Sequence, residues 1–110
     1  AFDAENYLEA AEMLNRFSQT YPDSPLIAEA HLLRGKAFEA VEDYKSSARA
    51  YLESYNTLKS ADALQRLSNS LISLGQMETG CQMLSQVELL FPGTAHAAAA
   101  QGEMQRLQCF

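Results

Sequence analysis

The sequence contains few of the residues that interrupt helices. Among its 110 residues are only five glycines and three prolines, and both residue types destabilise helix interiors. Apolar residues make up 47% of the chain, which is too many for a disordered segment. No apolar run approaches the length that spans a membrane. These features predict one all-α domain with short turns and no direct membrane insertion.

Basic residues are also scarce. Eight Lys and Arg residues stand against 14 Asp and Glu, which gives a net charge of −6, and the cations are scattered singly along the chain. Nucleic acids and anionic lipids are bound by clustered cations. We therefore expect neither nucleic acid nor a membrane surface as a partner.

Motifs of catalysis and metal binding are missing as well. The sequence has no Gly-rich phosphate loop, no Gly-x-Ser-x-Gly and no Cys-x2-Cys. Its two histidines, His31 and His96, are far apart in the sequence, and we expect His31 to be a partly buried packing residue rather than a general base. The sequence thus predicts a non-catalytic protein with no cofactor and no metal site.

A pattern of one small and one large residue, small-x3-large, recurs along the chain. Its three copies, at nearly equal spacing, are Ala10-x3-Leu14, Ser47-x3-Tyr51 and Gly80-x3-Leu84. A second pattern, Gly-x2-aromatic, is found at Gly35-x2-Phe38 and in degraded form at Ser68-x2-Leu71. Both patterns and their spacing are typical of tetratricopeptide (TPR) repeats, where small residues let antiparallel helices approach and large neighbours fill the gaps.

Capping residues set the expected helix boundaries. Asp43, Ser60 and Thr94 suit N-caps, and Ser24-Pro25 suits an N-cap followed by proline at the first helical position. We predict about six helices, at residues 3–20, 25–41, 44–57, 61–74, 77–90 and 94–108, with Gly75 and Gly93 in turns. The single domain, a TPR-type superhelix of antiparallel helix pairs, then consists of the second half of a first repeat (1–24), a second repeat (28–60), a third repeat (61–94) and a C-terminal capping helix (94–110).

Four segments carry a more specific resemblance, together with a Phe91-Pro-Gly-Thr turn and Cys109 near the C-terminus. They are Asn6-Tyr-Leu-Glu-Ala-Ala, Tyr21-Pro-Asp-Ser-Pro25, Glu42-Asp-Tyr-Lys-Ser-Ser-Ala48 and Leu74-Gly-Gln-Met-Glu-Thr-Gly-Cys81. Over nearly its whole length the sequence resembles the C-terminal TPR domain of the CpoB (YbgF) family, which is associated with the bacterial Tol–Pal system.

The resemblance implies a periplasmic location in Gram-negative bacteria and a role in coordinating outer-membrane constriction with peptidoglycan synthesis at division. It also implies TolA and the septal peptidoglycan synthesis proteins as partners, and a whole protein that trimerises through an N-terminal coiled coil. Because the sequence begins with Ala-Phe-Asp rather than Met, we expect a processed chain or an excised domain. For this fragment we expect a monomer, or a weak dimer formed through the exposed face of its first helix.

Cys81 and Cys109 are the two cysteines of the chain. The predicted helices place Cys81 near the start of the fifth helix and Cys109 at the end of the sixth, and antiparallel neighbours bring such positions together. A disulfide bond between them is expected, partly because the resemblance implies the oxidising periplasm. The alternative is two free thiols, with Cys81 as a small packing residue at a helix crossing.

In stacked repeats of this kind, the first helix of each pair lines a concave face on which a partner peptide or helix can bind. The residues expected there are Glu29, Leu32, Leu33, Lys36, Glu39 and Ala40 from the helix at 25–41, and Asp62, Gln65, Arg66, Asn69, Ile72 and Ser73 from the helix at 61–74. They combine apolar anchors with amides and cations. The alternative is that they face only water or the missing half of the first repeat.

The leading functional hypothesis is therefore a periplasmic, Tol–Pal-associated protein-binding scaffold. A second hypothesis is another envelope adaptor, such as an outer-membrane assembly lipoprotein with similar repeats. A third is a cytosolic chaperone-like TPR adaptor, which two reduced thiols would favour. An enzyme is the weakest hypothesis, since it would need carboxylates or histidines that converge in a pocket.

Overall fold

The structure is a computed structural model that describes residues 4–109, and it confirms the all-α fold class. The described residues form six helices and no strand. The helices are α1 (Ala4–Thr20), α2 (Ile27–Ala40), α3 (Tyr44–Thr57), α4 (Ala61–Ser73), α5 (Met77–Leu90) and α6 (Ala95–Leu107). Each boundary lies within two residues of the predicted one.

Side-chain caps begin three of the helices where the sequence predicts them. The side chains of Asp43, Ser60 and Thr94 each accept a hydrogen bond from the backbone N–H three residues later, which satisfies a donor that has no partner inside the helix. The fourth predicted cap is wrong in position. The hydroxyl of Ser24 accepts from the N–H of Leu26 in a turn, and α2 begins only at Ile27.

Residues in the left-handed backbone conformation follow several of the helices. Gly75 follows α4 with φ of +93° and Gly93 follows α5 with φ of +78°, so both lie in turns as predicted. Glu42 occupies the position of Gly75 one repeat earlier, in the turn after α2, and has φ of +62°. At this turn the N–H of Asp43 donates to the carbonyl of Phe38, and the matching bond closes α4 one repeat later.

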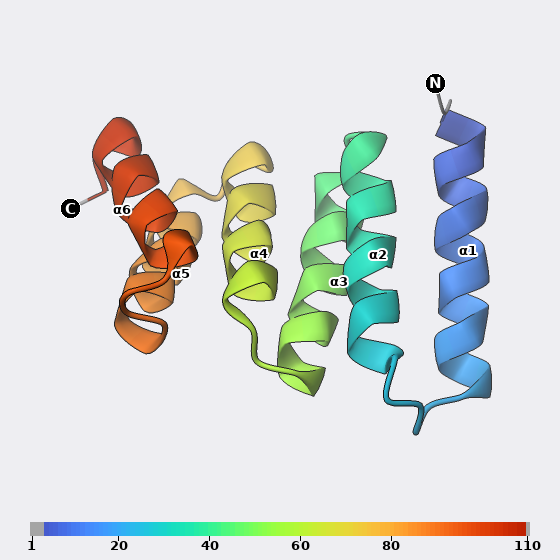
Figure 1. Ribbon diagram of the computed structural model, residues 1–110. Coiled ribbons are helices and arrows are strands. Elements are labelled where there is room, and N and C mark those ends of the chain that lie inside the picture. The colour runs from blue at the N-terminus through green and yellow to red at the C-terminus, as the bar shows by residue number, and fades with distance from the viewer. Residues whose placement is uncertain (1–3, 110) are drawn as a thin grey trace.

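Consecutive helices pack against one another as antiparallel neighbours, and α4 also contacts α6. Figure 1 shows an elongated array in which α6 lies in front of α5 and the two ends of the chain lie at opposite ends of the molecule. The principal extents are 41 × 29 × 23 Å. Each helix pair leaves an apolar face that only the next helix can cover, so this arrangement is compatible with a TPR-like array.

Small residues permit the closest helix crossings, as the repeat pattern predicts. A Cβ atom at Gly35 would lie 2.5 Å from Cε1 of the Tyr51 ring, and one at Gly80 would lie 2.4 Å from Cγ1 of Ile72. Glycine is therefore required for the α2–α3 and α4–α5 contacts to be this close.

The small residue predicted for α1 differs from the one that the structure buries. Ala10 is exposed, whereas Ala11 is 2% exposed and packs under α2. Ser47 and Gly80, at the matching positions of α3 and α5, are less exposed because each has a preceding helix to face: Ser47 is fully buried, and Gly80 meets Ile72 of α4. The described residues contain no helix before α1, so nothing among them covers Ala10.

The hydrophobic core lies mainly between α3 and α6. It consists of Ala48, Tyr51, Leu64, Leu67, Leu84, Val87 and Ala100. Tyr51, Leu84 and Val87 are fully buried. No residue of α1 or α2 belongs to this cluster, and the interior at that end of the array differs in its chemistry.

Candidate protein-binding surfaces

The predicted groove residues lie along α2 and α4 and belong to three different environments. Some line a hollow between α2 and α4, some face α1, and others pack inward. Their partner-binding role stays a prediction, but their positions are defined.

The first environment is a hollow of about 210 Å³ lined by Lys36, Glu39 and Ala40 of α2 and by Arg66 of α4. Lys36 and Ala40 are exposed, and Glu39 and Arg66 are half-buried. Within residues 4–109, Lys36 forms no ion pair. A free cation beside a small hollow between two repeats is suited to an acidic or carbonyl group of a partner.

Two side chains of this hollow are fixed by hydrogen bonds. The buried hydroxyl of Tyr51 donates to Glu39 across 2.6 Å, and Nε of Arg66 donates to both carboxylate oxygens of Asp62 at 3.0 and 3.1 Å. Burial and then the bond to the Glu39 carboxylate raise the pKa of Tyr51, so its phenol stays protonated. Burial alone would lower the pKa of Arg66, but the Asp62 bond and charge raise it and keep the guanidinium charged.

The other predicted groove residues of α4 either contact neighbouring helices or are exposed. Oε1 of Gln65 lies 2.6 Å from Nδ1 of His96, which joins α4 to α6. Ile72 packs against α5 at Gly80, and both Ile72 and Leu32 pack against the core cluster. Asn69 and Ser73 are exposed and remain accessible to a partner.

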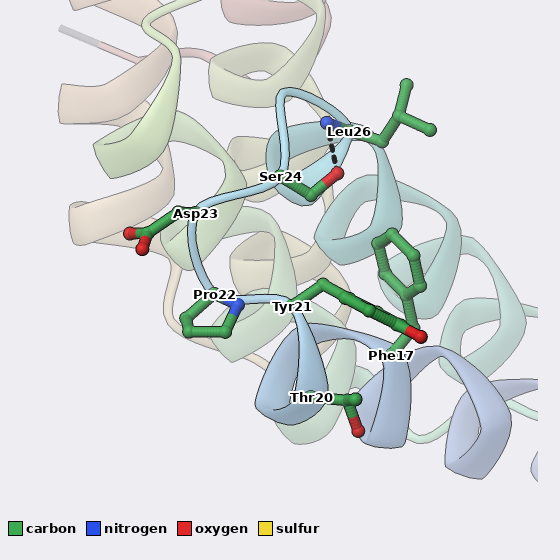
Figure 2. A pocket seen from close by; sticks show the side chains of 7 residues that line it. All are labelled: Phe17, Thr20, Tyr21, Pro22, Asp23, Ser24 and Leu26. Carbon is green, nitrogen blue, oxygen red and sulfur yellow. Dashed lines mark hydrogen bonds between the residues drawn. The ribbon is translucent and has the colours of Figure 1, made fainter.

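The second environment lies between α1 and α2. Glu29 and Leu33, both predicted for the concave face, line a hollow of about 190 Å³ with Leu14, Phe17, Leu26 and Ala30. A second hollow, of about 460 Å³, continues from it along the turn between the helices, with Phe17, Tyr21 and Leu26 among its lining residues. Figure 2 shows the rings of Phe17 and Tyr21 side by side there. We call Leu14, Phe17, Tyr21, Leu26 and Leu33 the α1–α2 groove.

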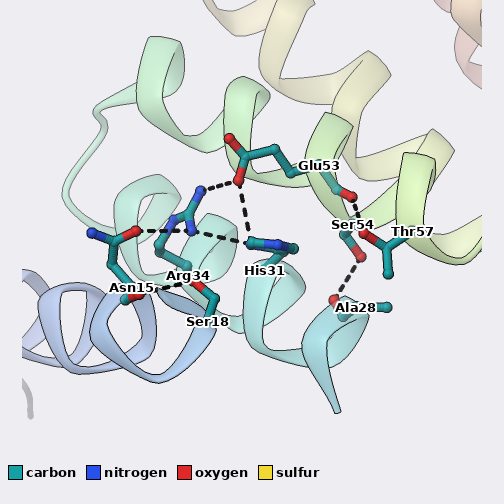
Figure 3. Close-up of polar contacts among 8 residues, drawn as sticks. All are labelled: Asn15, Ser18, Ala28, His31, Arg34, Glu53, Ser54 and Thr57. Atoms are coloured by element: carbon teal, nitrogen blue, oxygen red, sulfur yellow. Dashed lines mark hydrogen bonds and ion pairs between the residues drawn. The ribbon is translucent and has the colours of Figure 1, made fainter. Parts of the chain in front are cut away.

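A charged cluster joins α1, α2 and α3 on their inner side (Figure 3). Arg34, which is 8% exposed, donates to Oε2 of Glu53 at 2.7 Å and lies 3.5 Å from Oδ1 of Asn15. Its Nη1 also lies 3.1 Å from Nδ1 of His31, which is 3.3 Å from Glu53. Arginine can only donate, so His31 accepts this bond when it is neutral. Burial and then the charge of Arg34 lower the pKa of His31, and Glu53 only partly opposes them.

The opposite end of the array carries the disulfide bond. Cys81 of α5 and Cys109, which follows α6, are bonded, with their Cα atoms 5.6 Å apart. The predicted pairing is therefore confirmed, and neither cysteine is free. Such a bond is consistent with an oxidising compartment.

Residues 4–109 contain neither a candidate membrane span nor a candidate metal-binding cluster. No helix there is both long and apolar enough to cross a membrane. No group of three or more His, Cys, Asp and Glu side chains among residues 4–109 is placed to hold a metal ion.

Comparison with known proteins adds no relative. No family model matches the sequence, and no curated protein matches it. The class that the structure defines is an all-α domain of six sequentially packed helices among its described residues, compatible with a TPR-like array.

Proposed function

We propose that this protein is a non-catalytic, periplasmic scaffold that binds another protein on the surface shared by α2 and α4. The observation that carries the proposal is the hollow between Lys36, Glu39, Ala40 and Arg66. It joins two successive repeats at the face that stacked helix pairs commonly use for peptides and helices.

The local geometry supports binding rather than chemistry. Glu39 and Arg66 are held by Tyr51 and Asp62, so they are ordered before a partner arrives and lose little side-chain entropy on binding. Lys36 remains available for a partner carboxylate or carbonyl. The exposed amide of Asn69 lies on the same face of α4 as Arg66, three residues later.

The periplasmic part of the proposal is supported by the disulfide bond, which weighs against a cytosolic adaptor. The choice of partner rests on the resemblance of the sequence motifs to the CpoB family. It points to TolA or to a peptidoglycan synthesis protein at the division site. An outer-membrane assembly adaptor with similar repeats is the alternative that the experiment must separate.

The test is a calorimetric titration of the purified chain with the periplasmic part of TolA. We expect saturable binding that Lys36→Glu weakens by about ten-fold or more, because the charge is reversed within the hollow. The matched control is Lys45→Glu, which makes the same change on the exposed surface of α3 and should leave binding unchanged.

Equal effects of the two substitutions would show that binding does not use the α2–α4 surface. Absence of TolA binding, followed by Lys36-dependent binding of a septal peptidoglycan synthesis protein, would retain the scaffold and change its partner. If neither protein binds, the Tol–Pal assignment is wrong and the outer-membrane assembly adaptor becomes the leading hypothesis.

A further inference from the structure

The α1–α2 groove exposes several large apolar side chains. Tyr21 and Leu26 are 58% and 56% exposed, and Leu33 on the next turns of α2 is also exposed. With Phe17 they form a nearly continuous apolar surface along both helices and the turn that joins them. Apolar patches of this kind on soluble proteins commonly mark interaction sites.

Two positions of this groove are apolar where the next repeat has cations. At the matching positions of the next repeat, Leu26 corresponds to Lys59 and Leu33 corresponds to Arg66. Lys59 is exposed in the turn before α4, and Arg66 of α4 is half-buried and paired with Asp62. The earlier repeat has leucine at both, on the side of α2 that faces α1.

The shape of the groove fits a helix. In the repeat, α2 covers Tyr51 and the small-residue region of α3, with Gly35 at the crossing. The corresponding side of α1 presents the small residue Ala10, which is exposed. A helix laid along α1 and α2 would therefore meet a small residue at its crossing point and large side chains beyond it, as α2 does on α3.

The edges of the groove are acidic. Glu29 lines it from α2, and Asp23 lines it in the turn between α1 and α2. Neither carboxylate forms an ion pair within the described residues, and Lys36 is the one exposed cation of α2. Two copies of the chain that met face to face here would bring like charges together, which disfavours self-association.

We propose that the α1–α2 groove binds an amphipathic helix of another protein, with an apolar face flanked by Lys or Arg. Its apolar residues cover Phe17, Leu26 and Leu33, and its cations lie near Asp23 and Glu29. This surface is separate from the α2–α4 hollow, so the proposal does not rest on the function proposed above.

The test uses two synthetic peptides of about 15 residues, long enough to form a helix when bound. Both carry the same Leu and Ala face, and their flanks are Lys in one and Glu in the other. We expect the Lys peptide to bind the full chain saturably, by fluorescence anisotropy. We expect the Leu26→Ser, Leu33→Ser double variant to weaken binding by about ten-fold or more.

Three controls keep the proposal falsifiable. Both leucines are exposed, so the double variant should keep the circular dichroism of the parent. Leu89→Ser removes a leucine of α5 that is even more exposed than Leu26 and Leu33, and it should leave affinity unchanged. We expect the Glu peptide to bind more weakly than the Lys peptide, and Glu29→Gln should weaken the Lys peptide several-fold while strengthening the Glu peptide, because it removes a repelling charge.

Equal binding of the Lys peptide to the parent and to the double serine variant would overturn the proposal, as would no binding at all. A concentration-dependent dimer that the double variant abolishes would overturn it too, and would identify a second copy of the chain as the occupant instead. Equal affinity for the Lys and Glu peptides would overturn the assignment of a basic partner helix.

Discussion

The first junction of the array, where α1, α2 and α3 meet, has a charged cluster inside it, whereas the equivalent junction of α3, α4 and α5 is apolar. Three pairs of residues at matching positions of successive repeats show the exchange: His31 and Leu64, Arg34 and Leu67, Ser54 and Val87. The backbone follows the same course at both places, with the same helix order and the same turn after the first helix of each pair. The same arrangement of helices can therefore have either polar or apolar side chains at these interior positions.

The two solutions differ in what they contribute. Each fully buried Leu or Val stabilises the fold by roughly 1.5–3 kcal/mol, so the junction of α3, α4 and α5 carries most of the hydrophobic stabilisation. A buried ion pair roughly cancels its own desolvation cost. All buried side-chain polar atoms of the described residues nevertheless have partners, including Ser54, which donates to the carbonyl of Ala28. The polar junction therefore fixes geometry more than it adds stability.

The largest expected change in stability comes from placing an arginine in the apolar junction, at the position that matches Arg34. Leu67→Arg places a charge among Leu84 and Val87, and Gln86 stands where the first junction has Glu53. No countercharge is then available, and we expect a loss of about 3–5 kcal/mol in the free energy of unfolding. Urea unfolding followed by circular dichroism measures it.

The reverse exchange is the matched control. Arg34→Leu leaves Glu53 without its partner, but that side chain is 41% exposed and stays hydrated. We expect a change of only about 1 kcal/mol. Equal losses for Leu67→Arg and Arg34→Leu would mean that the two junctions are not energetically different.

The regular parts of the fold could be predicted because their signals are local. Asp43, Ser60 and Thr94 cap helices through bonds that span three residues, and the matching register of Ser47 and Gly80 in successive repeats sets the helix pairs. The cluster around Arg34 could not be predicted in the same way. Asn15 and Glu53 each lie 19 residues from Arg34, so their meeting depends on how three helices pack.

The candidate site was predictable only in part for a related reason. Lys36, Glu39 and Arg66 were predicted for one face and do line one hollow. Glu29 and Leu33 were predicted for the same face but line the α1–α2 groove. Helical spacing assigns residues to a side of α2, whereas the rotation between repeats decides which neighbour that side meets. The exposed leucines at 26 and 33, matched by cations one repeat later, were a signal in the sequence that could have indicated the groove.

The next largest change in stability is expected from removing the disulfide bond, which links α5 to the end of α6 and has no counterpart at α1 among the described residues. The Cys81–Cys109 bond closes a loop with a sequence separation of 28 residues, and the chain-entropy relation gives about 3.5 kcal/mol for such a loop. The Cys81→Ser, Cys109→Ser variant should lose about this much in urea unfolding. In this variant, hydrogen exchange should show that α6 loses more protection than α1. Among the described residues α1 has no disulfide bond, so the substitutions remove no link from it. Two reactive thiols in natively purified protein, counted by intact mass, would contradict the bond itself.

A smaller effect tests the polar junction through its histidine. Because burial and Arg34 lower the pKa of His31 below its ordinary 6.5, the unfolded chain binds the proton more readily than the folded one. The stability contributed by neutral His31 is fully present above pH 6.5 and is lost as the pH falls through the folded pKa. His31→Leu, which copies Leu64, should remove this part of the difference in unfolding free energy between about pH 7.5 and about pH 5. An unchanged difference in the variant would show that His31 is not the titrating group.

The smallest expected effect compares the two turns rather than the two junctions. Glu42 adopts φ of +62° where Gly75 has +93° one repeat later, and a left-handed conformation costs a non-glycine residue roughly 1–2 kcal/mol. Glu42→Gly would remove this cost, but glycine also gives the unfolded chain more conformational freedom, which offsets part of the gain. We therefore expect Glu42→Gly to stabilise the protein by about 0.5–1 kcal/mol. Gly75→Ala should destabilise it by a similar amount, and this loss comes from the backbone alone because a Cβ at Gly75 meets no atom within 4 Å. Calorimetric melting of both variants measures the pair of shifts. A loss of stability in Glu42→Gly would mean that the Glu42 side chain contributes more to the α2–α3 turn than its backbone strain costs.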